Sequence, residues 1–289
     1  MEHGVHDAPV GPGVWVSALA VLAVAALYAA GVLRLHARGD RWSLARSAAA
    51  GAAVVAMATA LLPPLGDRPD FVAHVVGHLL LAMVAPLLLA LAAPVTLALR
   101  ALPTTGRRLL LAVLHSRPAR AMTWAPVVAV LELGGMYAFY LTDLFALAHA
   151  HPALMALVHL HMVLAGLLLS VVLVGRDPLP QRPGIVGSLL LLLVVAAGHD
   201  VLAKLMYARL LPAGAGTPDE IRLGAQIMYY GGSAVEIALA VALMAGWYAR
   251  GGRELRRQRA REQISASAPG GSRAGPAPPR GAGQATLAR

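Results

Sequence analysis

The chain contains no cysteine and few charged side chains. Only 13% of its 289 residues are charged and 58% are hydrophobic, whereas soluble domains carry about 25% charged residues. The absence of cysteine excludes disulfides and thiolate ligands, so any metal site must use imidazole, carboxylate or thioether groups. This composition predicts an all-α integral membrane protein.

The sequence also lacks a P-loop, a GxSxG nucleophile elbow and an internal repeat, and we expect a protein that is not an enzyme. Its net charge of +10 raises the question of nucleic-acid binding. The arginines, however, crowd into a few loops and the C-terminal tail, which is the positive-inside pattern of a multi-pass membrane protein. We therefore expect no nucleic-acid partner.

Seven stretches approach or exceed the roughly 20 mostly apolar residues that a membrane span needs. They are Val14–Leu33, Leu44–Leu62, Phe71–Leu99, Ala121–Leu141, Pro152–Val174, Gly184–Tyr207 and Ile221–Ala249. The third contains Pro86 and Pro94, which remove backbone donors and should kink the helix or end it early. The sequence thus predicts a seven-transmembrane-helix bundle over residues 14–249.

The arginines also predict the orientation of the bundle. The loops after the first, third and fifth spans are rich in arginine, and the intervening loops are nearly empty of it, with Arg68 and the Arg209/Arg222 pair as exceptions. This alternation places the N-terminus outside and the C-terminus in the cytoplasm. Residues 1–13 lack the basic region of a signal peptide, so we expect an extracytoplasmic N-terminal segment and a retained first helix.

The last part of the chain, residues 250–289, is expected to lie in the cytoplasm. Arg250–Arg261 is a basic run next to the membrane, suited to anionic lipid headgroups. From Glu262 onward the sequence is rich in Pro, Gly, Ala and Ser, which predicts a disordered tail.

Ionisable residues inside spans are candidates for function. With this orientation, three helices place histidines in the outer half of the membrane: His74 and His78, His159 and His161, and His199. His74 and His78 are four residues apart and share a helix face. His159 and His161 are two apart, about 200° around a helix, so they cannot both face one ligand.

Thioethers accompany these histidines, since Met155 and Met162 lie on the same helix face as His159. Imidazole and thioether without thiol suit copper, particularly Cu(I). We therefore predict a shared metal site drawn from His74, His78, His159, His199, Met155 and His161. For each residue alone, an interhelical hydrogen bond or a packing role is the alternative.

The sequence around these histidines resembles the CtaG-type cytochrome c oxidase assembly factors. The segment "HVVGHLLLAMVAPLLLALAAP" is similar to the H-x3-H…AP-x-LL…AP stretch of that family. The segments "LVHLHMVLAG", "GHDVLAKLMY" and "LGAQIMYYGG" resemble its later helices in the same order, between Phe71 and Trp247. Met155 stands where a histidine is common in the family.

The resemblance implies a multi-pass protein of the bacterial cytoplasmic membrane that helps to equip haem–copper oxidases, plausibly in copper supply, with oxidase subunits as partners. Carried over by position, it implicates His74, His78, His159, His161 and His199. Our leading hypothesis is an assembly factor that holds or relays copper at an outer-facing site.

Three alternatives stay open at this point. The first is a redox protein with haem bound between two histidines, for which His78 and His159 are the suspected pair. The second is a proton or metal transporter that uses Glu132, Glu236 and the histidines. The third is a structural partner of the oxidase that holds no ligand.

Overall fold

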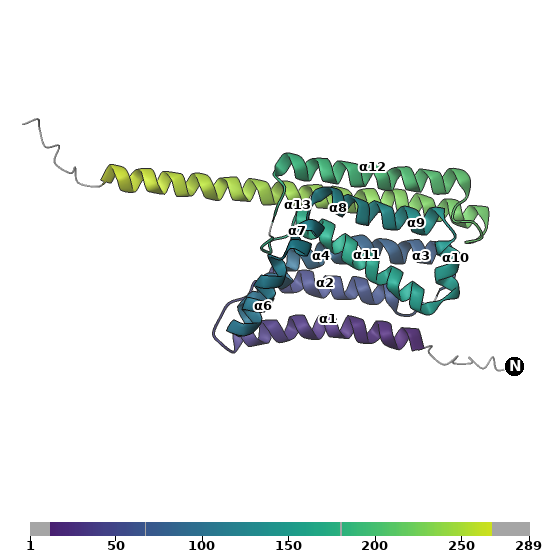
Figure 1. Cartoon of the computed structure of the whole chain (residues 1–289), viewed down its shortest axis with the longest axis horizontal. Helices are drawn as coiled ribbons and strands as arrows, with labels where there is room; N and C mark the ends of the chain where they lie inside the picture. The colour runs from purple at the N-terminus through teal and green to yellow at the C-terminus, as the bar shows by residue number, and fades with distance from the viewer. Residues whose placement is uncertain (1–11, 67, 180, 268–289) are drawn as a thin grey trace, which may run out of the picture. The chain divides into compact units, whose positions relative to one another are not determined.

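The computed structural model describes residues 12–66, 68–179 and 181–267, and every regular element in these ranges is a helix (Figure 1). The prediction of an all-α fold is therefore confirmed. The chain divides into two compact units, Met1–Ala245 and Gly246–Arg289. The predicted extracytoplasmic segment, apart from Pro12 and Gly13, lies outside the described residues.

Six helical stretches are long and apolar enough to cross a membrane. Five of them are α1 (Pro12–His36), α2 (Leu44–Leu61), α11 (Pro152–Leu173), α12 (Ile185–Arg209) and α13 (Pro218–Ser267). The remaining one is the segmented third span, Phe71–Ala101. These bounds differ from the predicted ones mainly at the C-terminal end of α13.

The predicted fourth span, Ala121–Leu141, is followed by a sharp bend. Most of this span consists of α8 (Ala125–Ala129), the π-helix η2 (Val130–Gly134) and α9 (Gly135–Leu141). The bend leads into α10 (Leu144–Ala150). The axis turns by 79° between Leu141 and Leu144. The described residues therefore contain six candidate spans, or seven when the bent pair is counted as one.

The third span is built from four helical pieces: α3 (Phe71–His78), the π-helix η1 (Leu79–Val84), α4 (Ala85–Ala92) and α5 (Pro94–Ala101). Pro86 has no N–H to donate, and the wider turns of η1 directly precede it. Ala93 adopts a left-handed conformation, φ 54°, and separates α4 from α5. Neither proline ends the span, which continues to Ala101.

Backbone groups on either side of the break at Ala93 are hydrogen-bonded to side chains from other parts of the protein. Tyr28 of α1 donates its hydroxyl to the Ala92 carbonyl oxygen at 3.1 Å. Asp177, in the loop after α11, accepts from the Thr96 N–H at 2.7 Å at the start of α5. These bonds satisfy groups that a helix end would leave unpaired in the membrane.

The segmented third span is packed on both sides, with α2 and α11 against η1 and α4. Gly166 lets α11 approach η1 and α4 closely. A Cβ at this position would overlap the Ala82 carbonyl oxygen and lie 3.1 Å from Pro86 Cγ. Ala82 is the residue whose carbonyl loses its usual donor when proline occupies position 86. Small residues at such crossings let helices approach closely in lipid.

The connections between spans separate to the two ends of the first unit. The α2–α3 loop, the α9–α10–α11 turn and the α12–α13 loop lie at one end (Figure 1). The arginine-rich connection after the third span, at the other end, contains α6 (Thr104–Leu114) and α7 (Arg117–Met122). Arginine placement predicts that the first of these ends faces outward, and that orientation stays a prediction.

Within the second unit, the helix α13 runs on through the basic run Arg250–Arg261 to Ser267. The prediction of disorder from Glu262 onward is therefore wrong for 262–267, which are helical. The rest of the predicted disordered tail, residues 268–289, lies outside the described residues. Contact of the basic run with lipid headgroups stays a prediction.

Candidate metal site

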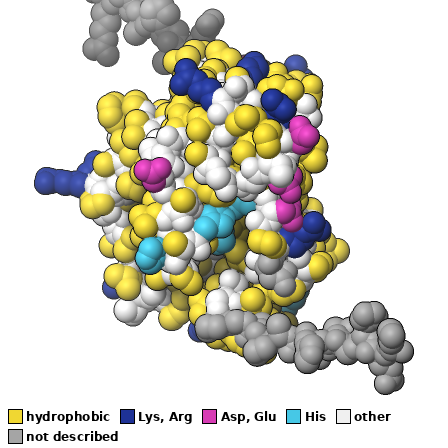
Figure 2. Space-filling view, turned by 90° about the vertical axis from the view of Figure 1, so that its right-hand side faces the viewer, with side chains coloured by type: hydrophobic (Ala, Val, Ile, Leu, Met, Phe, Trp, Pro, Cys, Tyr) yellow, Lys and Arg dark blue, Asp and Glu magenta, His cyan; other side chains and the backbone are white. Residues whose placement is uncertain are grey.

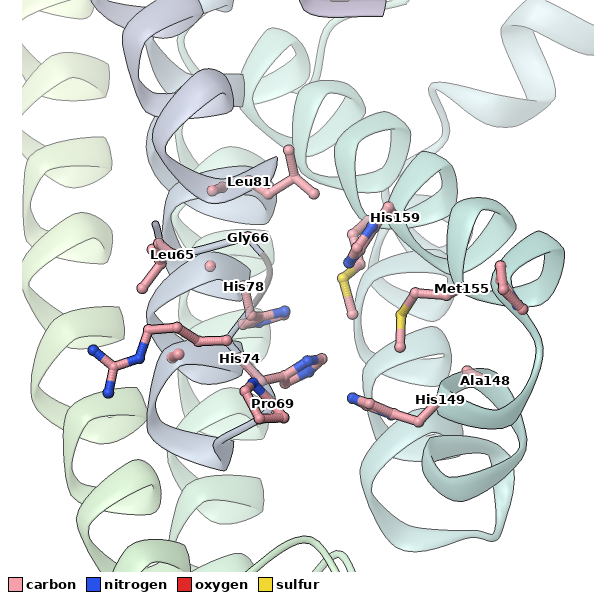
Figure 3. A pocket seen from close by; sticks show the side chains of 16 residues that line it. Leu65, Gly66, Pro69, His74, His78, Leu81, Ala148, His149, Met155 and His159 are labelled. Carbon is pink, nitrogen blue, oxygen red and sulfur yellow. The ribbon is translucent and has the colours of Figure 1, made fainter. Parts of the chain in front are cut away.

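A cavity of about 270 Å³ lies at the end of the bundle where α3 begins. Its walls come from the loop before α3 and from α3, α10 and α11, and histidine side chains are visible in a hollow on this end (Figure 2). His74, His78, His149, His159 and Met155 point into it (Figure 3). The cavity therefore gathers imidazoles from three helices, and the thioethers of Met155 and Met162 also line it.

The start of α3 sets the position of His74 and His78. The side chain of Asp70 accepts from the Ala73 N–H at 2.8 Å and so caps the helix, and it also accepts from Arg68 Nε at 2.8 Å. The Ala73 N–H and the Arg68 guanidinium hold the pKa of Asp70 below its ordinary value. With the helix anchored there, the two imidazoles lie one turn apart on the face toward the cavity.

Aromatic rings hold the imidazole of His74 in place. It stacks on Phe139 with ring centroids 5.4 Å apart, and the ring of His149 lies 5.3 Å away. His78 meets the ring of Tyr140 edge-on at 5.7 Å. His74 Nε2 and His78 Nδ1 are buried and have no hydrogen-bond partner in the protein. Packing thus orients both rings and leaves one nitrogen of each available to a ligand.

His149 was not among the predicted site residues. Its Nδ1 lies 2.8 Å from the Phe145 carbonyl oxygen, so Nδ1 carries the proton and Nε2 keeps its lone pair. A backbone carbonyl that fixes the tautomer in this way is a common support for metal-binding histidines. The sequence carries a signal for it, because His149 follows the fourth span at the same end as His74.

The face of α11 toward the cavity carries Met155, His159 and Met162. Pro152 begins this helix at its first turn, and the spacing of four and three residues then puts all three side chains on one side. The sequence prediction that Met155 and Met162 accompany His159 is confirmed by this arrangement.

His161 faces a different part of the bundle. Its Nε2 lies 3.1 Å from the Leu131 carbonyl oxygen of η2, and Gly135 leaves room for the ring, since a Cβ there would overlap it. His161 lines a separate, mostly apolar cavity of about 410 Å³. His159 and His161 thus line different cavities, as their spacing predicts, and His161 lies away from the histidine cavity.

His199 is also outside the histidine cavity. It is 2% exposed and lies against α13, with its Nδ1 3.5 Å from Glu236 Oε1. It lines a small inner cavity together with His78 and Glu132. The structure therefore brings together four of the predicted ligands, His74, His78, His159 and Met155, adds His149, and leaves out His161 and His199.

These features define a multi-pass helical membrane protein with a pocket lined by imidazole and thioether side chains at one end of its bundle. The sequence model of the family described as cytochrome c oxidase caa3 assembly factor (Caa3_CtaG) matches residues 26–250. The chain belongs to this family, and the resemblance found in its histidine segments is confirmed. No curated protein and no solved structure matches the chain. Family membership makes the chain an assembly factor that associates with a cytochrome oxidase.

Proposed function

We propose that this assembly factor holds Cu(I) as cargo in the histidine cavity and passes it to a haem–copper oxidase in the bacterial cytoplasmic membrane. One observation carries the proposal: His74, His78, His149, His159 and Met155 reach one cavity from α3, α10 and α11. Arginine placement predicts that this cavity opens on the outer face of the membrane, where copper would arrive without crossing the cytoplasm.

The donor atoms suit Cu(I). Buried polar atoms without a partner cost about 1–3 kcal/mol each, and His74 Nε2 and His78 Nδ1 are two such atoms. An ion bound between them would satisfy both. The five donor side chains are neutral imidazoles and a thioether, a soft set that matches Cu(I) better than Mg²⁺, Ca²⁺ or Mn²⁺.

The exposure of the ligands suits transfer rather than permanent storage. His149 is exposed, His74 and His159 are half-buried, and His78 is 6% exposed. His149 sits on α10, beyond the 79° bend, so an ion can meet this ligand first and the buried one last. Release to an oxidase subunit follows the reverse order.

The other two ligand-based hypotheses fit the structure less well. The haem hypothesis paired His78 with His159, and the cavity that both line is about 270 Å³, smaller than the roughly 300–1,000 Å³ usual for organic ligands. The larger cavity of about 410 Å³ is lined by His78 and His161 and does not include His159. For a transporter, a polar path must continue past Glu236. The residues packed beyond it in the described part of the chain are aliphatic and include Leu169, Leu239 and Leu243.

The test is Cu(I) binding by the purified full chain in detergent, measured without oxygen against a competing chelator. We expect one Cu(I) per chain at this cavity. Affinity should fall at least tenfold in His78→Ala and in His159→Ala, because each removes one donor. His151→Ala and His161→Ala are matched controls that remove an imidazole outside the cavity and should bind as the wild type does.

A triple variant with alanine at His74, His78 and His159 supplies the refutation. If it binds Cu(I) as the unaltered chain does, the proposed site is wrong. In cells, deleting the protein should lower oxidase activity and oxidase copper together, and added copper should restore part of both. Loss of oxidase activity with normal oxidase copper would show that the assembly role does not involve this metal.

A further inference from the structure

We propose a second metal site, at which His199 and Asp200 of α12 and Glu236 of α13 bind a divalent transition-metal ion of the Zn²⁺ type. It is separate from the Cu(I) site proposed above and uses none of its five donors. The sequence prediction placed His199 in the same site as His74, whereas the structure puts His199 with two carboxylates instead.

The distances fit an ion held between these side chains. One donor atom from each of His199, Asp200 and Glu236 lies within 4.8 Å of the other two. His199 Nδ1 and Glu236 Oε1 are 3.5 Å apart, which exceeds the usual hydrogen-bond range of about 2.7–3.2 Å. Two donors placed about 2.1 Å from a tetrahedral ion lie about 3.4 Å apart. Small side-chain rotations bring the third donor to the same distance.

Two of the three side chains are buried and lack partners. His199 is 2% exposed and Glu236 is 8% exposed. The two ring nitrogens of His199 and the Oε1 atom of Glu236 have no hydrogen-bond partner among the described residues. Unpartnered polar atoms in the interior carry a desolvation penalty, and one bound ion would satisfy two of these three, a ring nitrogen of His199 and Glu236 Oε1.

The surroundings hold the three side chains in position. Gly232 of α13 makes room for the His199 ring, because a Cβ there would overlap its Cε1 atom. Ser233 donates its hydroxyl to the Tyr229 carbonyl oxygen at 2.8 Å, and its Oγ atom lies 3.4 Å from Asp200 Oδ1, beside the carboxylate that would bind the ion. The pair Gly232–Ser233 therefore supports both ligands that α12 supplies.

Charge balance distinguishes this site from the histidine cavity. Two carboxylates and one divalent ion sum to zero, which lowers the cost of burying the ion in the low-dielectric interior. Imidazole with carboxylate favours a divalent ion, whereas the imidazole and thioether donors of the outer cavity favour Cu(I). The two sites thus select ions of different charge.

The structure also provides room for an ion. The inner cavity lined by His199 and Glu236 has a volume of about 20 Å³, enough for one water-sized occupant. His78 lies in the walls of both this cavity and the outer one, so the two sites are neighbours in the bundle.

The experiment uses the full chain in detergent, stripped of metal with a chelator. Cu(I) is added first, without oxygen, to fill the outer cavity, and Zn²⁺ binding is then measured by competition with a zinc indicator. We expect one Zn²⁺ per chain in addition to the Cu(I). Glu236→Gln and Asp200→Asn each keep the shape of the side chain but remove its charge, and each should weaken Zn²⁺ binding at least tenfold while Cu(I) binding stays within twofold.

Glu132→Gln is the matched control, since it also removes a carboxylate that lines the inner cavity. It should leave Zn²⁺ affinity within threefold. Absence of Zn²⁺ binding in the Cu(I)-loaded chain, or equal loss in Glu132→Gln and Glu236→Gln, would overturn the inner site. The Cu(I) measurement decides the proposed function independently through His159→Ala, because His159 lines the outer cavity and not the inner one.

Discussion

Replacing Gly166 by alanine tests whether the close approach of α11 to the third span positions the histidine cavity. The added Cβ would overlap the Ala82 carbonyl oxygen and lie 3.0 Å from its carbon and 3.1 Å from Pro86 Cγ. Favourable carbon–carbon contacts need about 3.5–4.0 Å, so the two helices must separate by about 0.5–1 Å. Backbone atoms and a proline ring cannot rotate out of the way.

The expected loss of stability follows from two opposing effects. Overpacking costs about 1–3 kcal/mol, and contact with backbone puts this substitution at the upper end. Alanine also stabilises a helix relative to glycine by about 0.5–1 kcal/mol. We expect a net loss of about 2 kcal/mol, or on the order of 4–8 °C in Tm for a domain of this size.

The same shift should reach the metal site. His159 lies seven residues before Gly166 on α11, two turns away on the same face. Metal–ligand distances tolerate only about 0.2 Å, so we expect Cu(I) affinity to fall about tenfold. Gly51→Ala in α2 is the control, because nothing lies within 4 Å of a Cβ there, and it should not lower stability or Cu(I) binding.

Thermal unfolding of the detergent-solubilised protein and the Cu(I) competition assay provide the two measurements. If Gly166→Ala unfolds at the wild-type temperature and binds Cu(I) with wild-type affinity, the helix crossing does not control the cavity. A loss of stability with unchanged Cu(I) affinity would show that the crossing stabilises the bundle but does not position His159.

Two further predictions concern the helix start and the inner site. Asp70 has a lowered pKa in the folded protein, so its charge stabilises the fold above the unfolded pKa of about 3.9 and this contribution is lost as the pH falls through the folded value. Asp70→Asn, which still caps α3, should be less stable by about 0.3–1 kcal/mol at pH 7. This difference in thermal unfolding should vanish as the pH falls below the folded pKa of Asp70, and a gap that persists at the lowest pH at which the protein stays folded would contradict the prediction. Gly232→Ala should push the His199 ring aside. We therefore expect Zn²⁺ binding to weaken at least tenfold while Cu(I) binding stays unchanged. Wild-type Zn²⁺ affinity in this variant would argue against the inner site.

The sequence by itself determined the membrane spans and the end of the bundle at which the first histidines gather. Long apolar runs bounded by arginine-rich loops are a one-dimensional signal, because a helix in lipid must satisfy its own backbone and expose apolar side chains. Helical spacing also determined that His74 and His78 share a face and that His159 and His161 do not.

Only the tertiary structure decided which histidines meet. The 79° bend after α9 folds α10 back over the cavity and brings His149 into it. Thr142 hydrogen-bonds the backbone on both sides of the break, but the direction in which the chain turns there depends on packing between helices. The packing of α12 against α13 directs His199 to Glu236 instead of His74. The depth of a residue in the membrane follows from its position along a spanning helix. The direction of its side chain around the bundle axis depends instead on how neighbouring helices rotate to fit one another.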